Sequence, residues 1–374
     1  MYLRLLSRFF WILVGSVFIL SGLIKLNDPV GTAIKLEEYF EVFAHDFGVF
    51  FLSFRSASRF LSITLSAAEV TLGAALLLRY QLRITLWLLL GLTVFFGLLT
   101  FYSAAFNKVT DCGCFGDAIK LTPWMSFWKD LVLLGGVVFL LRTHERWLKP
   151  YNRRPLIGTV LVTSAAGVAV GIGVWALGHL PIVDLLPYGP GKDIGQQMKP
   201  AEAPRYRYTF TKPDGSTVES EQYLMDSTLK YKAMEVLNPA ESKPKITDLR
   251  VWNAQTDNYE QELLRGNKLV LVIQGFEKLD RDRMPSIAEL MRQAAASSRH
   301  IEPVILTAAS QADFEVFRHE KKLTSPYYFA DATVLKTMIR SNPGLLLLQN
   351  GRVINKWHYH DLPSLRGVEK GLEK

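Results

Sequence analysis

Long apolar runs dominate the first half of the chain and end near residue 180. Five of them approach the roughly 20 residues that cross a bilayer as a helix. They are Phe9–Ile24, Phe60–Leu78, Ile84–Phe101, Leu131–Leu141 with its aromatic shoulder Trp124, Phe127 and Trp128, and Leu156–Leu177. Phe47–Phe54 is too short to span and is typical of an interfacial or re-entrant segment. The pattern predicts an α-helical membrane bundle with a fifth transmembrane helix added to four.

The second half alternates strand and helix patterns of the length found in soluble domains. Continuous apolar runs predict buried strands at Leu269–Ile273 and Pro303–Leu306. Helical spacing at Pro285–Ala296, Gln311–Lys321 and Thr333–Ile339 is followed by the hairpin pattern Leu345–Leu348, Asn-Gly and Val353–His358. This order predicts an α/β domain with a mixed sheet and helices on both faces.

Changes in composition divide the chain into four parts. Between the last predicted transmembrane helix and the α/β domain, the Pro- and Gly-rich stretch from His179 to Pro204 is typical of a tether. Pro213-Asp-Gly, further along, indicates a β-hairpin. A further strand is expected at Thr247–Val251. The predicted parts are a membrane bundle at 1–145, a fifth transmembrane helix at 156–177, a linker with a hairpin at 178–245, and the α/β domain at 246–374.

Charge indicates the orientation of the helices. The chain has 43 Lys and Arg against 35 Asp and Glu, a net charge of +8. Basic residues gather before the first helix, at Arg79 and Arg83, and between Arg142 and Arg154, which by the positive-inside rule places these segments in the cytoplasm. We expect a multi-pass protein of a bacterial inner membrane with an uncleaved first helix and an extracytoplasmic C-terminal domain. The basic excess fits membrane lipid and not nucleic acid.

The only two cysteines, Cys112 and Cys114, flank Gly113 in a loop predicted to face outward. Residues two apart are separated by about 5.5–7 Å at Cα, near the upper limit for a disulfide. Such a bridge closes almost no loop and adds little stability, which favours a redox-active pair. A static disulfide, inert thiols and a metal site are the alternatives. We expect no metal, because Asp111 and Asp117 are poor ligands beside thiolates.

One carboxylate lies in the middle of a predicted span. An ionisable residue at that depth is a functional-site hypothesis by default. Glu69 is therefore a candidate proton relay, and Lys25, at the end of the first helix, is its candidate partner. The alternatives are a neutral glutamic acid hydrogen-bonded within the bundle and a purely structural Lys25–Glu69 pair.

The α/β domain resembles thioredoxin-like domains. The resemblance rests on the element order and on Asn342-Pro343 directly before the final hairpin, where that family places a cis-proline beside its active site. The family's Cys-x-x-Cys belongs at Glu277–Pro285, where this sequence has no cysteine. Without a thiolate the domain lacks the nucleophile for exchange, so the resemblance implies partner binding at Asn342 and Pro343.

The membrane bundle resembles the DoxX family, and its MauE branch in particular. The resemblance covers about residues 1–145 and rests on Ser21-Gly22 with Lys25 and Asp28-Pro29, on Ala68-Glu69 with Gly73, and on the run Cys112-Gly-Cys-Phe-Gly116. It implies an envelope redox role, since MauE-type proteins are associated with maturation of methylamine dehydrogenase, which requires disulfide formation. The chain departs from the family in its fifth helix and long C-terminal domain.

These observations give one principal hypothesis and one alternative. In the first, Cys112 and Cys114 exchange disulfides with envelope protein thiols or with a separate thioredoxin-like protein, as a thiol-disulfide oxidoreductase. Electrons pass to a quinone while Glu69 handles a proton. In the alternative, the protein is a non-enzymatic assembly scaffold of the envelope, anchored by its bundle.

Overall fold

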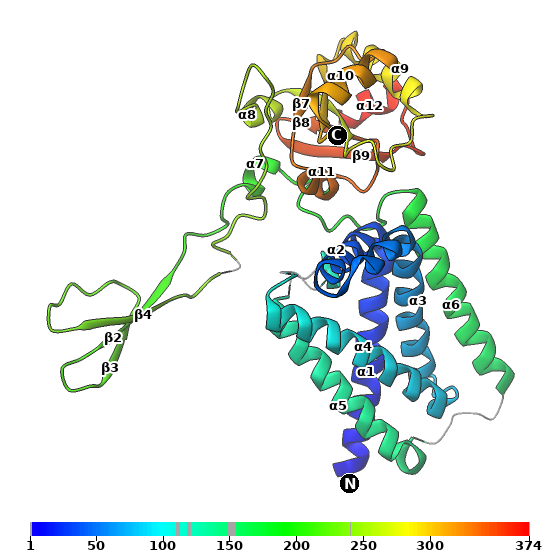
Figure 1. Ribbon diagram of the computed structural model, residues 1–374, viewed down its shortest axis with the longest axis vertical. Helices are drawn as coiled ribbons and strands as arrows, with labels where there is room; N and C mark the ends of the chain where they lie inside the picture. The colour runs from blue at the N-terminus through cyan, green and yellow to red at the C-terminus, as the bar shows by residue number, and fades with distance from the viewer. Residues whose placement is uncertain (1, 110–112, 118–120, 149–154, 240, 374) are drawn as a thin grey trace. The chain divides into compact units, whose positions relative to one another are not determined.

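The computed structural model describes residues 2–109, 113–117, 121–148, 155–239 and 241–373. The chain forms two compact units, Met1–Leu185 and Leu186–Lys374. The first unit is helical, and the second contains both sheets (Figure 1).

Five long helices build the first unit (Figure 1). They are α1 (Tyr2–Asn27), α3 (Ser58–Leu77), α4 (Leu82–Phe106), α5 (Pro123–Trp147) and α6 (Pro155–Gly178). Within the described residues, five segments are long and apolar enough to cross a membrane: Tyr2–Asn27, Val49–Leu77, Leu82–Phe106, Pro123–Arg146 and Leu156–Gly178. The five predicted spans are confirmed as apolar helices.

Small residues bring α1 and α3 into close contact. A Cβ atom at Gly22 would lie 2.6 Å from the Ser66 carbonyl oxygen, and one at Gly73 would lie 2.8 Å from the Gly15 carbonyl oxygen. Close backbone approach at small residues is a common way for membrane helices to associate, because van der Waals packing replaces the hydrophobic effect there. The contact fixes which side chains of α1 and α3 face each other.

The fifth long helix, α6, packs on α3 and α1. Ala169 is buried in a cluster with Leu26, Ile63 and Val70, and the backbone at Gly173 approaches Leu26 and Ile63 closely. A second cluster joins α1, α3, α4 and α5 through buried residues that include Val14, Leu76, Leu86 and Val137.

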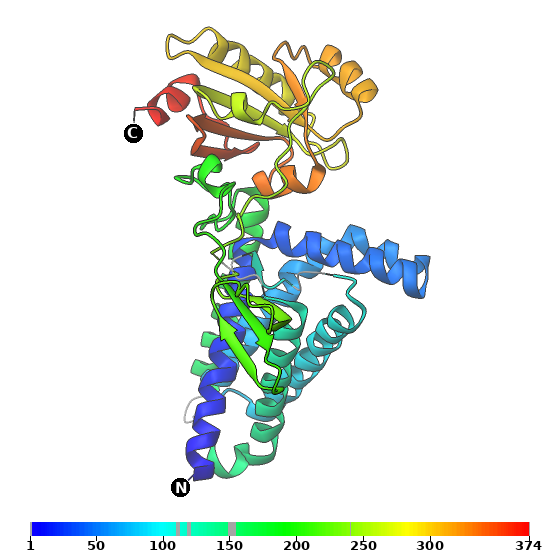
Figure 2. The same ribbon diagram turned by 90° about the vertical axis from the view of Figure 1, so that its left-hand side faces the viewer.

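A helix that the apolar pattern did not predict follows α1. This helix, α2 (Pro29–Phe47), and the 3₁₀ segment η1 (Val49–Ala57) cross one end of the bundle (Figure 2). Asp28 caps α2 by accepting a 2.8 Å hydrogen bond from the Gly31 amide, and Pro29 occupies its first turn. Phe47 and Phe50, in the run expected to be interfacial or re-entrant, are 65% and 72% exposed.

The second unit begins with short elements and a small sheet. A four-residue helix, α7 (Ile194–Gln197), precedes β2 (Tyr206–Thr211), which pairs antiparallel with β3 (Thr217–Ser220) and with β4 (Lys230–Val236). β2 and β3 form a hairpin around Pro213-Asp-Gly, where Gly215 has a φ of +86°. The pattern did not predict β4.

The strand expected at Thr247–Val251 is wrong. Its backbone finds other partners, since the Val251 amide donates to the Glu260 side chain at 2.7 Å, at the start of α8 (Glu260–Leu263). A single bridge joins Trp252 to Phe329. A backbone amide that already donates to a side chain does not require a hydrogen bond to a neighbouring strand.

A five-stranded mixed sheet forms the centre of the second unit. Its order is β7-β6-β5-β8-β9. β5, β6 and β7 are parallel to one another, β8 is antiparallel to β5, and β9 is antiparallel to β8. The strands are β5 (Asn267–Ile273), β6 (Ile301–Thr307), β7 (Tyr327–Phe329), β8 (Gly344–Gln349) and β9 (Arg352–His358). This confirms the predicted α/β class and adds the edge strand β7.

Four helices accompany this sheet. α9 (Met284–Ala295), α10 (Gln311–Glu320) and α12 (Leu365–Gly371) share one core with the β5 side chains Leu269, Leu271 and Ile273. α11 (Ala332–Met338) lies on the other face (Figure 2). The Asn342–Pro343 peptide directly before β8 is cis.

Candidate functional site

A buried ion pair joins α1 to α3. Lys25 Nζ lies 2.5 Å from Glu69 Oε1, and the two side chains are only 8% and 2% exposed. The Ser21 hydroxyl donates to Glu69 Oε2 at 2.8 Å, and Lys25 Nζ lies 4.6 Å from the centre of the Phe96 ring. Both carboxylate oxygens are therefore occupied, as a buried charge requires.

A small pocket, called here the polar pocket, opens beside this pair. It has a volume of about 60 Å³, enough for a few water molecules. Helices α1 to α4 all contribute to it, and so does the segment around Cys112 and Cys114, called here the cysteine loop. Its lining consists of Lys25, Thr32, Lys35, Leu36, Tyr39, Leu65, Ser66, Glu69, Phe96, Leu99, Thr100 and Gly113.

Gly113, the residue between the two cysteines, brings the cysteine loop to the polar pocket. It adopts a φ of +61°, and a Cβ atom there would lie 3.2 Å from Lys35 Cγ. Its carbonyl accepts a 3.0 Å hydrogen bond from the amide of Gly116, which has a φ of +53°. Only glycine adopts such left-handed conformations without strain, which explains the two glycines of this run.

The predicted redox residues themselves are described only in part. Cys112 lies outside the described residues. The backbone of Cys114 begins the short strand β1 (Cys114–Asp117), but its side chain also lies outside them. The structure thus brings Lys25, Glu69 and the backbone between the cysteines to one pocket, and the sulfur–sulfur relationship stays a prediction.

Ser66 has the one buried hydroxyl of the polar pocket that lacks a hydrogen-bond partner among the described residues. It is 1% exposed. A buried hydroxyl without a partner costs roughly 1–3 kcal/mol, so a group in the pocket that accepts its hydrogen bond would be favoured. Sequence reasoning missed Ser66, because serine is common where membrane helices approach closely and carries no distinctive signal.

A second polar cluster lies next to the cysteine loop. Asp130, 3% exposed, accepts a 3.0 Å hydrogen bond from the Thr100 hydroxyl and is 2.7 Å from Lys129 Nζ. Lys129 Nζ lies 5.3 Å from the centre of the Phe115 ring, within the cysteine run. The sequence held a signal for this cluster, since Lys129-Asp130 directly precedes an apolar span.

The start of the loop is anchored by side chains from α2 and α4. Ser103 donates to the carbonyl of the buried Val109 at 2.9 Å. Asp46 accepts a hydrogen bond from Tyr102, and its Oδ1 lies 3.0 Å from Lys108 Nζ. The hydrogen bond from Tyr102, followed by those from His45 and Lys108, holds the pKa of the Asp46 carboxyl well below its usual range.

In the second unit, Asn342 ties the end of the α11 loop to the segment after β5. Its Oδ1 accepts from the Gln274 amide at 3.0 Å, and its Nδ2 donates to the carbonyls of Gly275 and Glu277 at 2.9 and 3.2 Å. Pro343 is buried and Asn342 half-buried. The expected partner-binding pair therefore borders the charged segment Glu277–Arg283, most of whose side chains are exposed.

Residues 3–143 match the family "Methylamine utilisation protein MauE". The match covers the ion pair, the polar pocket and the cysteine loop, and it ends before α6. With the five apolar helices, the similarity to MauE indicates a multi-pass membrane protein. No curated protein and no solved structure matches the chain.

Proposed function

We propose that this protein is an envelope thiol–disulfide exchange protein whose redox pair is Cys112 and Cys114. The observation that carries the proposal is the position of Gly113. The backbone between the two cysteines borders a pocket that also holds a buried lysine–glutamate pair. The similarity of residues 3–143 to MauE supports the same redox-related role.

The proposed exchange has two balanced steps. In the first step a partner thiolate attacks the Cys112–Cys114 disulfide, so that a mixed disulfide forms and one loop thiolate is released. In the second step the partner's other thiol attacks this mixed disulfide and releases the second loop thiolate. The partner is then oxidised by two electrons and the loop is reduced to a dithiol. The partner is an envelope protein thiol or a separate thioredoxin-like protein.

A quinone is the proposed oxidant that restores the disulfide. Two electrons and two protons leave the dithiol and reduce the quinone to quinol. Glu69 is the group in the polar pocket that can accept and pass on a proton, and Lys25 stabilises its charged form at 2.5 Å.

The proposed location follows from charge. With Arg4, Arg79 and Arg153 in the cytoplasm, the cysteine loop and the second unit lie outside the inner membrane. An outward loop faces an oxidising compartment, where disulfides persist.

The second unit is proposed to be a thioredoxin-like domain that binds the partner without doing exchange chemistry. The strand order, its parallel and antiparallel halves, and the place of Asn342 beside the segment after β5 support this. The exposed charges of Glu277–Arg283 take the place of a Cys-x-x-Cys and offer a polar contact surface.

Single-cysteine variants test the exchange directly. Cys112→Ser and Cys114→Ser each leave one thiol that cannot be released from a mixed disulfide by its neighbour. At least one of them should accumulate a covalent partner adduct in membranes that a reductant removes, while the double serine variant should accumulate none. If neither variant forms an adduct and envelope thiol oxidation is unchanged in the double variant, the exchange proposal is wrong and the scaffold alternative stands.

A further inference from the structure

A second buried carboxylate in the bundle has the same kinds of partner as Glu69. Asp130, on α5, is 3% exposed. Its Oδ1 lies 2.7 Å from Lys129 Nζ, and its Oδ2 accepts a 3.0 Å hydrogen bond from the Thr100 hydroxyl. Glu69 likewise has a lysine at one oxygen and a hydroxyl at the other. An ionisable residue within a membrane-crossing helix is a functional-site hypothesis by default, and the exchange function proposed above gives Asp130 no role.

Both ion pairs lie beside the cysteine loop. Glu69 lines the polar pocket together with Gly113. Lys129 Nζ, in the second ion pair, lies 5.3 Å from the centre of the Phe115 ring. Gly113 and Phe115 are the two neighbours of Cys114 in the chain. One neighbour of Cys114 therefore borders the first ion pair, and the other borders the second.

Thr100 joins the second ion pair to the polar pocket. It lines that pocket with Glu69 and is only 2% exposed. Its one hydroxyl hydrogen has three acceptors within reach, Asp130 Oδ2 at 3.0 Å and the carbonyls of Phe96 and Gly97 at 3.0 and 3.2 Å. Hydrogen bonds to a charged acceptor are the stronger kind. While it donates to Asp130, the hydroxyl oxygen can still accept a hydrogen bond from the pocket, so it can pass a proton between the two.

The polar pocket suits water. A buried water needs about two to four polar partners. The pocket lining offers the hydroxyls of Ser66 and Thr100 and the remaining lone pairs of the Glu69 carboxylate. The Ser66 hydroxyl is 1% exposed and has no hydrogen-bond partner among the described residues. A water in this pocket would satisfy that hydroxyl and connect Glu69 to Thr100.

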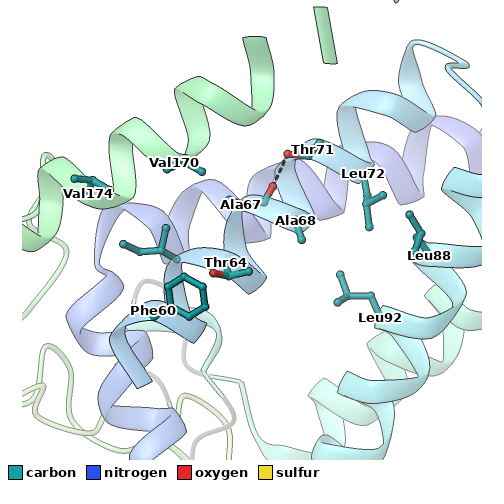
Figure 3. Close-up of a pocket in the computed structure, with 11 residues that line it drawn as sticks. Phe60, Thr64, Ala67, Ala68, Thr71, Leu72, Leu88, Leu92, Val170 and Val174 are labelled. Atoms are coloured by element: carbon teal, nitrogen blue, oxygen red, sulfur yellow. Dashed lines mark hydrogen bonds between the residues drawn. The ribbon is translucent and has the colours of Figure 1, made fainter. Parts of the chain in front are cut away.

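The larger space in the bundle does not suit a proton path. This apolar cavity, of about 660 Å³, lies between α3, α4 and α6 (Figure 3) and shares no lining residue with the polar pocket. Among its described lining residues none is ionisable. The Thr71 hydroxyl in that lining donates to the Ala67 carbonyl at 2.7 Å within α3. The polar pocket is therefore the route considered for protons from the cysteine loop.

From these observations we propose that Asp130 is a second proton-carrying residue of the redox cycle, joined to the polar pocket by Thr100 and water. The inference rests on the proposed exchange function and deepens it, because oxidation of a dithiol releases two protons and Glu69 takes up one. When the disulfide forms again, two S–H bonds break, the S–S bond forms and two electrons reduce the quinone. Glu69 and Asp130 each take up one proton and release it again, and the quinol gains two protons.

Two threonines of α4 provide a matched test. Thr93 and Thr100 are both 2% exposed and both donate to the carbonyl four residues earlier, and of these two only Thr100 also donates to a carboxylate among the described contacts. The full-length protein in detergent is reduced with dithiothreitol, desalted and mixed with ubiquinone-1, and the loss of alkylatable thiols is followed. Thr100→Val should regenerate the disulfide about tenfold more slowly than the unmodified protein, and Thr93→Val should match the unmodified rate.

Variants of Asp130 separate a proton-carrying role from a structural one. Asp130→Asn keeps an oxygen that accepts from Thr100 but cannot take up a proton, so regeneration should slow about tenfold. Asp130→Glu restores the carboxylate and should recover most of the rate. Added imidazole should accelerate Asp130→Asn in proportion to its concentration, because a base from solution then accepts the proton, and should leave the unmodified protein unchanged.

The outcomes distinguish this inference from the exchange function. Equal rates in Thr100→Val and Thr93→Val, a normal rate in Asp130→Asn, or a slow Asp130→Asn that imidazole does not accelerate would each overturn the role of Asp130 and leave exchange intact. If quinone does not reoxidise the unmodified loop, the proposed quinone step is wrong and the role of Asp130 is wrong with it. The single-cysteine adducts then still decide the exchange function.

Discussion

Glu69 is stabilised as a charged group by neighbours that the chain supplies from a different helix. Lys25 and Ser21 occupy both of its oxygens, so the pair is a matched unit and not a single buried charge. The apolar surroundings made Glu69 and Lys25 easy to find in the sequence. Ser66 and Thr100 could not be found in the same way, because their significance depends on which helix faces them.

Removing one member of the pair should cost more than removing both. Glu69→Gln or Lys25→Met leaves one buried charge without compensation and should destabilise the bundle by about 3–5 kcal/mol. The double variant Lys25→Met/Glu69→Leu should recover most of that loss. Thermal unfolding of the full chain in detergent measures the effect, and a double variant less stable than either single one would contradict the ion-pair account.

The same double variant separates a structural pair from a proton relay. If Glu69 carries a proton, a stable double variant should still oxidise partner thiols but should regenerate its disulfide at least tenfold more slowly with added quinone. An unchanged rate of disulfide regeneration would mean that the Lys25–Glu69 pair has a purely structural role.

Asp46 gives the loop anchor a defined pH dependence. Its pKa is lowered in the folded state by Tyr102, His45 and Lys108, so its contribution to stability is complete above the unfolded pKa of about 3.9 and is lost as the pH falls through the lower folded pKa. The difference in unfolding temperature between the unmodified protein and Asp46→Asn should be constant from about pH 8 to pH 5 and shrink below that. A difference that grows on acidification would contradict the assigned direction.

At the scale of elements, close contact between α1 and α3 sets the geometry of the site. Length and hydropathy predicted the membrane helices, because a span must satisfy its backbone internally over a fixed thickness. They did not predict α2, whose residues Lys35, Glu37, Glu38 and Glu41 interrupt the apolar pattern. They missed β4 and β7 as well, since edge strands depend on the neighbours they pair with.

A pair of glycine variants tests this contact. Gly22→Leu would force a side chain against the Ser66 carbonyl, whereas Gly91→Leu in α4 enters open space. Overpacking typically costs about 1–3 kcal/mol, so Gly22→Leu should lower the unfolding temperature and Gly91→Leu should leave it nearly unchanged. Equal effects of the two substitutions would mean that α1 and α3 are not in close contact.

At the scale of the whole molecule, the proposed topology, in which all five candidate helices of the described residues cross the membrane, puts the two ends of the bundle in different compartments. The division into a helical unit and an α/β unit was predictable from the change in composition near residue 180. The proposed orientation predicts that a protease added outside intact spheroplasts digests the second unit and spares the segment Arg142–Arg154. Protection of the second unit would reverse the orientation and place the cysteine loop in the cytoplasm.

Cys112 and Cys114 are the proposed redox pair of the whole protein. The most direct test is the thiol state of the two residues in isolated membranes, followed by alkylation mass shift across a graded thiol–disulfide buffer. We predict a reversible two-electron transition at a potential well above about −300 mV, among labile and catalytic disulfides. A pair that stays in one state over the whole range would contradict it.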